Sequence, residues 1–192
     1  MAAVETLGEE SPRELRAEPP CIEAIYRDHA DFVWGCLQRF GIRHPQLDDA
    51  SQEVFVVVHQ RLASFRGEAG IKTWLYAICL RVAGAHRRKQ ARRREVPVED
   101  WSEPEGPEDS SPEHGLTWRE RRRALEAILD ELTLEKRGLL VMYEIDELPC
   151  EEIGAILGVP IGTVYSRLHA ARAAFDKAVV RFRARSEQGI RS

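Results

Sequence analysis

Two stretches of this 192-residue sequence gather side chains that can contact nucleic acid. The first runs from Arg81 to Arg94 and holds seven basic residues and no acidic one. Lysine and arginine in such a run neutralise phosphates, and aromatic rings, which occur just before it, can stack on unpaired bases. The second, residues 149–175, has the spacing of a helix-turn-helix, whose second helix lies in the major groove of DNA. Both stretches indicate binding rather than covalent chemistry.

The helix-turn-helix is indicated by the positions of its apolar and small residues. In the first helix apolar side chains share one face, and Gly154 lets a second helix approach closely. Gly158 ends this helix, and Pro160 fits the start of the next. The second helix has an inward stripe formed by Val164, Leu168, Ala171 and Phe175. Its polar outer face can meet bases and phosphates through Thr163, Tyr165, Ser166, Arg167, His169 and Arg172. The same spacing also fits a helical hairpin inside an ordinary bundle.

The sequence contains no pattern typical of an enzyme or of a metal site. We find no glycine-rich phosphate loop, no nucleophile elbow and no grouping of histidines with acids. The four cysteines are scattered, so they indicate reduced thiols rather than a zinc site or a disulfide framework. We therefore expect no enzyme activity, no metal and no cofactor. The acidic N-terminus and the lack of a long apolar run predict a cytoplasmic protein without a membrane segment.

Charge is segregated along the chain, although the formal net charge is only −4. Residues 95–113 hold eight acidic residues and no basic one, and the segment 95–115 contains four prolines, which is linker composition. At about 3.3 Å per residue this segment can span roughly 70 Å, enough for two modules to reach separate sites on one DNA. One hypothesis is that the acidic linker folds over the basic end of the preceding helix in the free protein. The simpler alternative is that the acids only keep the linker extended.

Apolar residues recur at helical intervals on both sides of this linker, so the predicted fold class is all-α with two small helical domains. Before the linker we expect three helices, and even the β-branched run Val54–Val58 continues a helical stripe. After the linker we expect a four-helix unit that ends in a long C-terminal helix. The predicted organisation is a disordered tail (1–20), a first domain (21–94), an acidic, proline-rich linker (95–115), a second domain (116–185) and a short tail (186–192).

Three segments in this order resemble the extracytoplasmic-function (ECF) sigma factors, the smallest class of the sigma-70 family. They are Leu47–Phe55, then Phe65–Glu68 with Thr73–Tyr76, and finally Glu151–Gly154 continuing to Ser166–His169. The resemblance covers nearly everything from Ile22 to about Phe182 except the linker. It implies that the first domain is sigma region 2, which binds core RNA polymerase and opens the minus-ten element. The second domain would be region 4, which reads the minus-thirty-five element.

The resemblance also implies roles for individual residues. An acidic and amide face would dock on the polymerase through Asp48, Asp49, Gln52 and Glu53. By spacing alone, that face would be interpreted as a solvated helix surface. Minus-ten DNA would be contacted by Arg66, Lys72, Thr73, Trp74, Tyr76, Arg81, Arg87 and Arg88. Trp74 taken alone is interpreted as a core residue. The minus-thirty-five element would be contacted by the six outer residues of the helix-turn-helix named above.

The sequence departs from the family's pattern at some of these positions. Tyr165 and Ala170 stand where family members commonly carry a cation, so phosphate contacts should be weaker or promoter preference shifted. Ile71 replaces a common aromatic residue and Arg81 a common asparagine, which leaves the details of minus-ten preference open.

The predicted function is therefore that of a sigma factor directing promoter-specific transcription initiation. Its implied partners are core RNA polymerase and promoter DNA. Many family members are also held by an anti-sigma factor, which a single sequence does not reveal. The alternative left open is a one-component helix-turn-helix regulator that binds operator DNA independently of polymerase. An enzyme tethered to a DNA-binding domain is the least supported interpretation.

Overall fold

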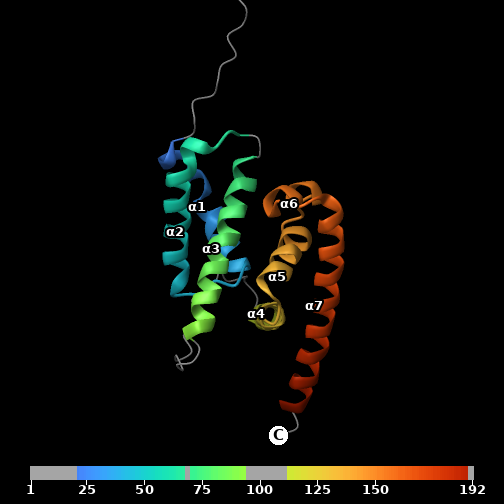
Figure 1. Cartoon of the computed structure of the whole chain (residues 1–192). Coiled ribbons are helices and arrows are strands. Elements are labelled where there is room, and N and C mark those ends of the chain that lie inside the picture. Colours follow the sequence, from blue (N-terminus) through green and yellow to red (C-terminus); the bar gives the residue numbers. More distant parts are fainter. Residues whose placement is uncertain (1–20, 68–69, 94–111, 190–192) are drawn as a thin grey trace, which may run out of the picture.

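The computed structural model describes residues 21–67, 70–93 and 112–189, and every regular element in these ranges is a helix. The helices up to Arg93 form one group and those from Pro112 onward form another, and Figure 1 shows the two groups side by side. The all-α fold class and the division into two helical domains, as predicted from the sequence, are confirmed.

The first domain contains the helices α1 (Ile22–Arg39), α2 (Gln46–Arg61) and α3 (Ile71–Arg93), with the short 3-10 helix η1 (Leu62–Ser64) after α2. Each helix buries a stripe of apolar side chains that recur every three to four residues. In the valine-rich run of α2, Val54 and Val58 are fully buried, whereas Val56 between them is exposed. Residues four apart share a face in a helix, whereas in a strand Val56 would lie on the same face as Val54 and Val58. Packing of the helical stripe therefore overrides the strand propensity of valine.

The second domain contains α4 (Pro112–Asp130), α5 (Leu134–Leu140), the π-helical turn η2 (Val141–Ile145), α6 (Cys150–Leu157) and α7 (Ile161–Gly189). The Thr133 side chain caps α5 by accepting a hydrogen bond from the Lys136 amide. α7 forms the outer edge of this domain in Figure 1, on the side away from the first domain. In its N-terminal half the side chains of Tyr165, Ser166 and His169 are exposed.

Two helix ends differ from the expectation. α4 begins at Pro112, inside the segment 95–115 expected to be a linker. Proline is tolerated in the first turn of a helix, because its missing N–H would have no partner there, so this residue starts the helix instead of preventing it. α7 continues to Gly189, past the expected domain end at residue 185. The N-terminal tail, residues 95–111 of the linker and residues 190–192 lie outside the described residues.

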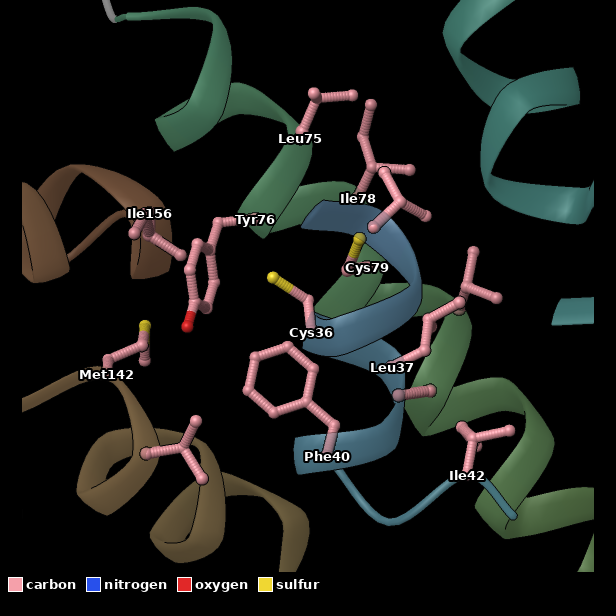
Figure 2. Packing of buried hydrophobic residues seen from close by; sticks show 14 of the residues in the cluster. Cys36, Leu37, Phe40, Ile42, Leu75, Tyr76, Ile78, Cys79, Met142 and Ile156 are labelled. Carbon is pink, nitrogen blue, oxygen red and sulfur yellow. The ribbon is translucent and has the colours of Figure 1, made fainter. Parts of the chain in front are cut away.

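The two domains share one buried apolar cluster, a contact that the sequence did not predict. α3 packs against α6 along the boundary between them (Figure 1). In Figure 2 the ring of Tyr76 points from α3 toward the side of Met142 and Ile156 in the second domain. The same ring lies 5.6 Å from the ring of Phe40, the residue that follows α1, centroid to centroid. α3 thus buries two faces, one in its own domain and one against its neighbour.

A polar network beside this cluster connects the domains. The guanidinium of Arg137 in α5 is buried, and it donates to the backbone carbonyl of Arg39 at 2.7 Å and to the carboxylate of Asp130 at 2.6 Å. Arg43 of the first domain pairs with the same carboxylate. A buried arginine with two hydrogen-bond partners contributes to stability mainly because losing either side would leave polar groups unsatisfied.

The second half of the network centres on Asp146, just after η2. Its carboxylate accepts a hydrogen bond from the Tyr76 hydroxyl and forms an ion pair of 3.1 Å with Arg39. Partial burial raises the pKa of the Asp146 carboxyl, and the Arg39 guanidinium opposes that rise. We use the name interdomain joint for Arg39, Arg43, Tyr76, Asp130, Arg137 and Asp146.

Candidate nucleic-acid interface

The residues from α6 to the first half of α7 have the helix-turn-helix geometry that the sequence predicts. Gly158 ends α6 with a φ of 65°, in the left-handed region that favours glycine. The Val159 amide donates to the Gly154 carbonyl at 3.0 Å. A Cβ on Gly154 would lie 2.9 Å from the Val159 carbonyl oxygen, so glycine is needed where the turn passes over α6. Ile153 and Val164 are fully buried behind the turn.

The two faces of α7 divide as the sequence pattern indicates. Its inward stripe includes the buried residues Val164, Leu168 and Ala171. Outside lie the exposed side chains of Tyr165, Ser166, His169 and Arg172, with Thr163 and Arg167 half-buried at the flank. This face offers hydrogen-bond donors, acceptors and an aromatic ring, which are the groups that read base edges in a major groove.

Both arginines of this face are paired with acidic residues of the same domain. Arg167 forms an ion pair of 2.7 Å with Glu135 at the start of α5, and Arg172 forms one of 2.7 Å with Glu144 in η2. The Arg172 guanidinium also lies over the ring of Tyr143, 5.1 Å from its centroid. Its hydrogen bond to Glu144 raises the pKa of Arg172. No sequence pattern singles out either acid, because only the fold brings α5 and η2 beside α7.

In the first domain the expected minus-ten residues differ in exposure. Trp74 packs its ring against Phe65, with centroids 4.8 Å apart. The Lys72 ammonium lies 5.9 Å from the centroid of the Phe32 ring. The exposed members of the set are Arg66, Lys72, Arg81 and Arg88, and the half-buried ones are Thr73, Trp74 and Arg87.

Tyr76 and Arg87 are turned toward the second domain. Tyr76 is only 2% exposed, and its hydroxyl is bound to Asp146. Arg87 donates to the backbone carbonyl of Leu132 at 3.1 Å. The expected contact between Tyr76 and DNA is therefore blocked in this arrangement of the domains. The reason is the second buried face of α3, which helical periodicity within the first domain does not reveal.

The expected polymerase-binding face of α2 is open to solvent. Its residues Asp48, Asp49, Gln52 and Glu53 are all exposed. Glu53 contacts His86 of α3 at 2.8 Å, whereas Asp48 and Asp49 have no ion pair within the described ranges. Beside this face runs a groove of about 750 Å³ whose lining includes the aromatic residues Tyr26, Trp34 and Phe55. No sequence motif singles out these three aromatic residues as a group, because only the packing of α1 beside α2 brings them together.

The described part of the chain gives no indication of a metal site, a disulfide or a membrane-spanning helix. No group of three histidine, cysteine or acidic side chains there could hold a metal ion. The four cysteines are free, and a hydrogen bond with Cys36 together with burial raises the pKa of the Cys79 thiol. Among the described helices, none has the length and apolar character needed to cross a membrane.

Comparison with protein families gives a match in each domain. The model for sigma-70 region 2 matches residues 25–93, and the model for sigma-70 region 4 matches residues 122–175. The two matches fall on the two helical domains, in the order expected from the sequence motifs. Region 4 covers the helix-turn-helix, and region 2 covers α2, the loop after it and α3.

Two solved structures share the fold. One is the sigma factor RpoE of Bartonella quintana in complex with the anti-sigma factor NepR, with a TM-score of 0.62 and 18% identity over 82% of this chain and 95% of that one. The other is CnrH in complex with the cytosolic domain of CnrY, with a TM-score of 0.55 and 22% identity over 81% of this chain and 85% of that one.

Curated relatives extend the likeness to sequence. The RNA polymerase sigma-H factor of Pseudomonas aeruginosa is 29% identical over 174 residues, which cover 87% of this chain and 90% of the relative. The ECF RNA polymerase sigma-E factor of Escherichia coli is 35% identical over 138 residues, which cover 68% of this chain and 72% of the relative. With both sigma regions in order and this level of identity, the chain belongs to the ECF sigma factors of the sigma-70 family.

Proposed function

We propose that this sigma factor directs promoter-specific transcription initiation by holding core RNA polymerase with α2 and promoter DNA with α3 and α7. The observation that carries the proposal is the polar outer face of α7, which buried residues of α6 and α7 hold out to solvent. A helix presented in this way fits the major groove, where hydrogen-bonding side chains distinguish base pairs.

The face of α2 formed by Asp48, Asp49, Gln52 and Glu53 is the proposed polymerase-docking surface. Exposed carboxylates and an amide at helical spacing complement a basic helical partner, and complementary charge raises both the rate and the specificity of association. The neighbouring groove with its aromatic lining adds an apolar component to this surface.

The minus-ten element is proposed to bind the loop after η1 and the N-terminal half of α3. Arg66, Lys72 and Arg81 are exposed there and suit phosphates, and Thr73 can bond to an unstacked base. Tyr76 can join them only after the domains separate, because its ring and hydroxyl are now held against the second domain. Arg87 and Arg88 further along α3 would follow the DNA backbone.

The minus-thirty-five element is proposed to bind Thr163, Tyr165, Ser166, Arg167, His169 and Arg172. Two exposed positions of this face, Tyr165 and Ala170, lack the cation that family members commonly carry. Each missing phosphate contact lowers affinity and the slope of its salt dependence. The helix-turn-helix alone should therefore bind weakly, and polymerase must add affinity by tethering it.

An anti-sigma partner and a location are part of the proposal. Both structural neighbours were solved as complexes, one with an anti-sigma factor and one with the cytosolic domain of CnrY. We extend such a partner to this chain, and we place the chain in the cytoplasm, where bacterial polymerase works. Its role needs no catalytic group of its own, because polymerase supplies the chemistry.

A transcription assay tests the proposal against the one-component alternative. The full chain is added to core RNA polymerase on sheared genomic DNA of its source, and start sites are mapped. A sigma factor gives discrete start sites only when both proteins are present. Tight, sequence-specific binding by the chain alone, without any effect of core polymerase, would instead establish an operator-binding regulator.

Gln52→Arg is expected to reduce this transcription at least about tenfold, because a cation is placed where the proposed surface meets a basic partner and like charges at an interface cost several kcal/mol. Gln52 is exposed, so folding stability should change by no more than about 0.5 kcal/mol. Competition with unlabelled wild-type protein for core polymerase measures the loss of docking.

The matched control is Ala184→Arg, which adds the same charge at an exposed position near the end of α7. Its transcription and its competition for core polymerase should equal those of the wild type. Equal activity of Gln52→Arg and the control would show that this face of α2 is not part of the docking surface.

A further inference from the structure

The two arginines on the outer face of α7 do not point in one direction. They are five residues apart, which places them roughly 140° apart around a helix. Each arginine lies at one flank of the outer face and pairs with an acid from a neighbouring element. Arg167 pairs with Glu135 of α5, and Arg172 pairs with Glu144 of η2. The exposed residues between the flanks, Ser166 and His169, carry no ion pair within the described part of the chain.

Folding stability does not account for these two ion pairs. The side chains of Glu135 and Glu144 are 57% and 46% exposed, and those of Arg167 and Arg172 are 40% and 50% exposed. Ion pairs with this much solvent contact contribute about 0–1 kcal/mol. The domain core beneath them is apolar and already well buried at Val164 and Leu168.

The positions of Glu135 and Glu144 affect how α7 can bind the phosphates of DNA. When a helix lies in the major groove, its centre faces base edges and its two flanks face the phosphates along the two walls of the groove. Arg167 and Arg172 occupy those flanks, so phosphates and the two carboxylates compete for the same guanidinium groups. A carboxylate 2.7 Å from each arginine would also repel an incoming phosphate.

We propose that Glu135 and Glu144 are specificity-determining residues that neutralise Arg167 and Arg172 in the free protein and so suppress binding to DNA of arbitrary sequence. Phosphate contacts supply nearly all of the affinity for arbitrary DNA, whereas base contacts at the centre of the helix do not depend on these arginines. Weakening the phosphate contacts while leaving the base contacts intact increases the ratio of specific to nonspecific binding. The proposal deepens the proposed function and rests on α7 being the helix that reads the minus-thirty-five element.

The test measures binding of the full chain to a random-sequence duplex by fluorescence anisotropy over a range of salt concentrations. Glu135→Gln and Glu144→Gln each remove one charge and keep the shape of the side chain. Each is expected to tighten this binding about three- to tenfold near 0.1 M salt and to increase the salt slope by roughly one. Glu144→Asp keeps the charge and should behave like the wild type.

Two comparisons connect the effect to the arginines. Glu187→Gln removes the same charge from an exposed site on α7, roughly 22 Å further along the helix than Arg172, and should leave binding unchanged. In an Arg172→Ala background, Glu144→Gln should have little effect, because the carboxylate then has no arginine to neutralise. A full effect in that background would mean that the acid merely repels DNA, and the pairing proposal would be overturned.

Unchanged or weaker binding by Glu135→Gln and Glu144→Gln would also overturn the proposal, since weaker binding would mean that the acids orient the arginines for DNA. This outcome is distinct from failure of the proposed function. The proposed function fails in the transcription assay with wild-type protein and core polymerase, whatever the two variants do on random DNA.

Discussion

Gly154→Ala is expected to destabilise the second domain by about 1–3 kcal/mol and to abolish recognition of the minus-thirty-five element. The added Cβ would lie 2.9 Å from the carbonyl oxygen of Val159 and 3.7 Å from the side chain of Val164. The oxygen belongs to the backbone of the turn, so it cannot move away without displacing α7. Urea unfolding followed by circular dichroism measures the loss of stability, and DNA binding with core polymerase measures the loss of recognition.

Gly162→Ala provides the matched control in the same motif. A Cβ at Gly162 would meet nothing within 4 Å, and the residue lies in the first turn of α7. Alanine there should be neutral or stabilising by up to about 1 kcal/mol, because it lowers the entropy of the unfolded chain. Equal stability of the Gly154→Ala and Gly162→Ala proteins would contradict the close approach of turn and helix.

Arg137→Met is expected to lower the free energy of unfolding by about 2–3 kcal/mol, somewhat less than the roughly 3–5 kcal/mol lost when a fully buried ion pair is broken. Arg137 is 3% exposed, and its removal leaves the Arg39 carbonyl without its donor and Asp130 with Arg43 alone. The expected loss is smaller because the Asp130 side chain is 36% exposed. Methionine keeps most of the volume of the side chain, so the effect reports the polar contacts.

The same substitution should also uncouple the two domains. Wild-type protein, with one buried cluster across both domains, is expected to unfold in a single transition, whereas Arg137→Met should show two. Arg122→Met is the control, because Arg122 makes an exposed pair with Glu126 one turn away, worth about 0.5 kcal/mol or less. A single transition with an unchanged midpoint for Arg137→Met would show that the interdomain joint adds nothing to stability.

The sequence was sufficient where local periodicity determines structure. Apolar spacing predicted the helices, including the valine-rich part of α2, and the small residues at Gly154 and Gly158 predicted the helix-turn-helix. These features depend on residues within a few turns of one another. The start of α4 at Pro112 was missed because proline both breaks helices and suits their first turn.

Features that depend on distant residues could not be predicted. Tyr76 was assigned to DNA because the motif around it resembles a promoter reader, but its burial depends on α6, some eighty residues later in the chain. Glu135 and Glu144 look like ordinary solvated acids in sequence, and only the packing of α5 and η2 beside α7 pairs them with arginines. The residue roles proposed for polymerase and promoter remain predictions for the assays above.

The burial of Tyr76 between the domains makes the proposed promoter recognition and the closure of the two domains competing equilibria. In its proposed role Tyr76 cannot be bound to Asp146 and to DNA at once, so molecules in the closed form are unable to bind a promoter through this residue. For each amount of about 1.4 kcal/mol by which closure is favoured, the apparent affinity for a promoter falls roughly tenfold. A less stable protein, such as one with a weakened interdomain joint, would thus bind promoters more tightly, and folding stability would be a poor guide to activity in the cell.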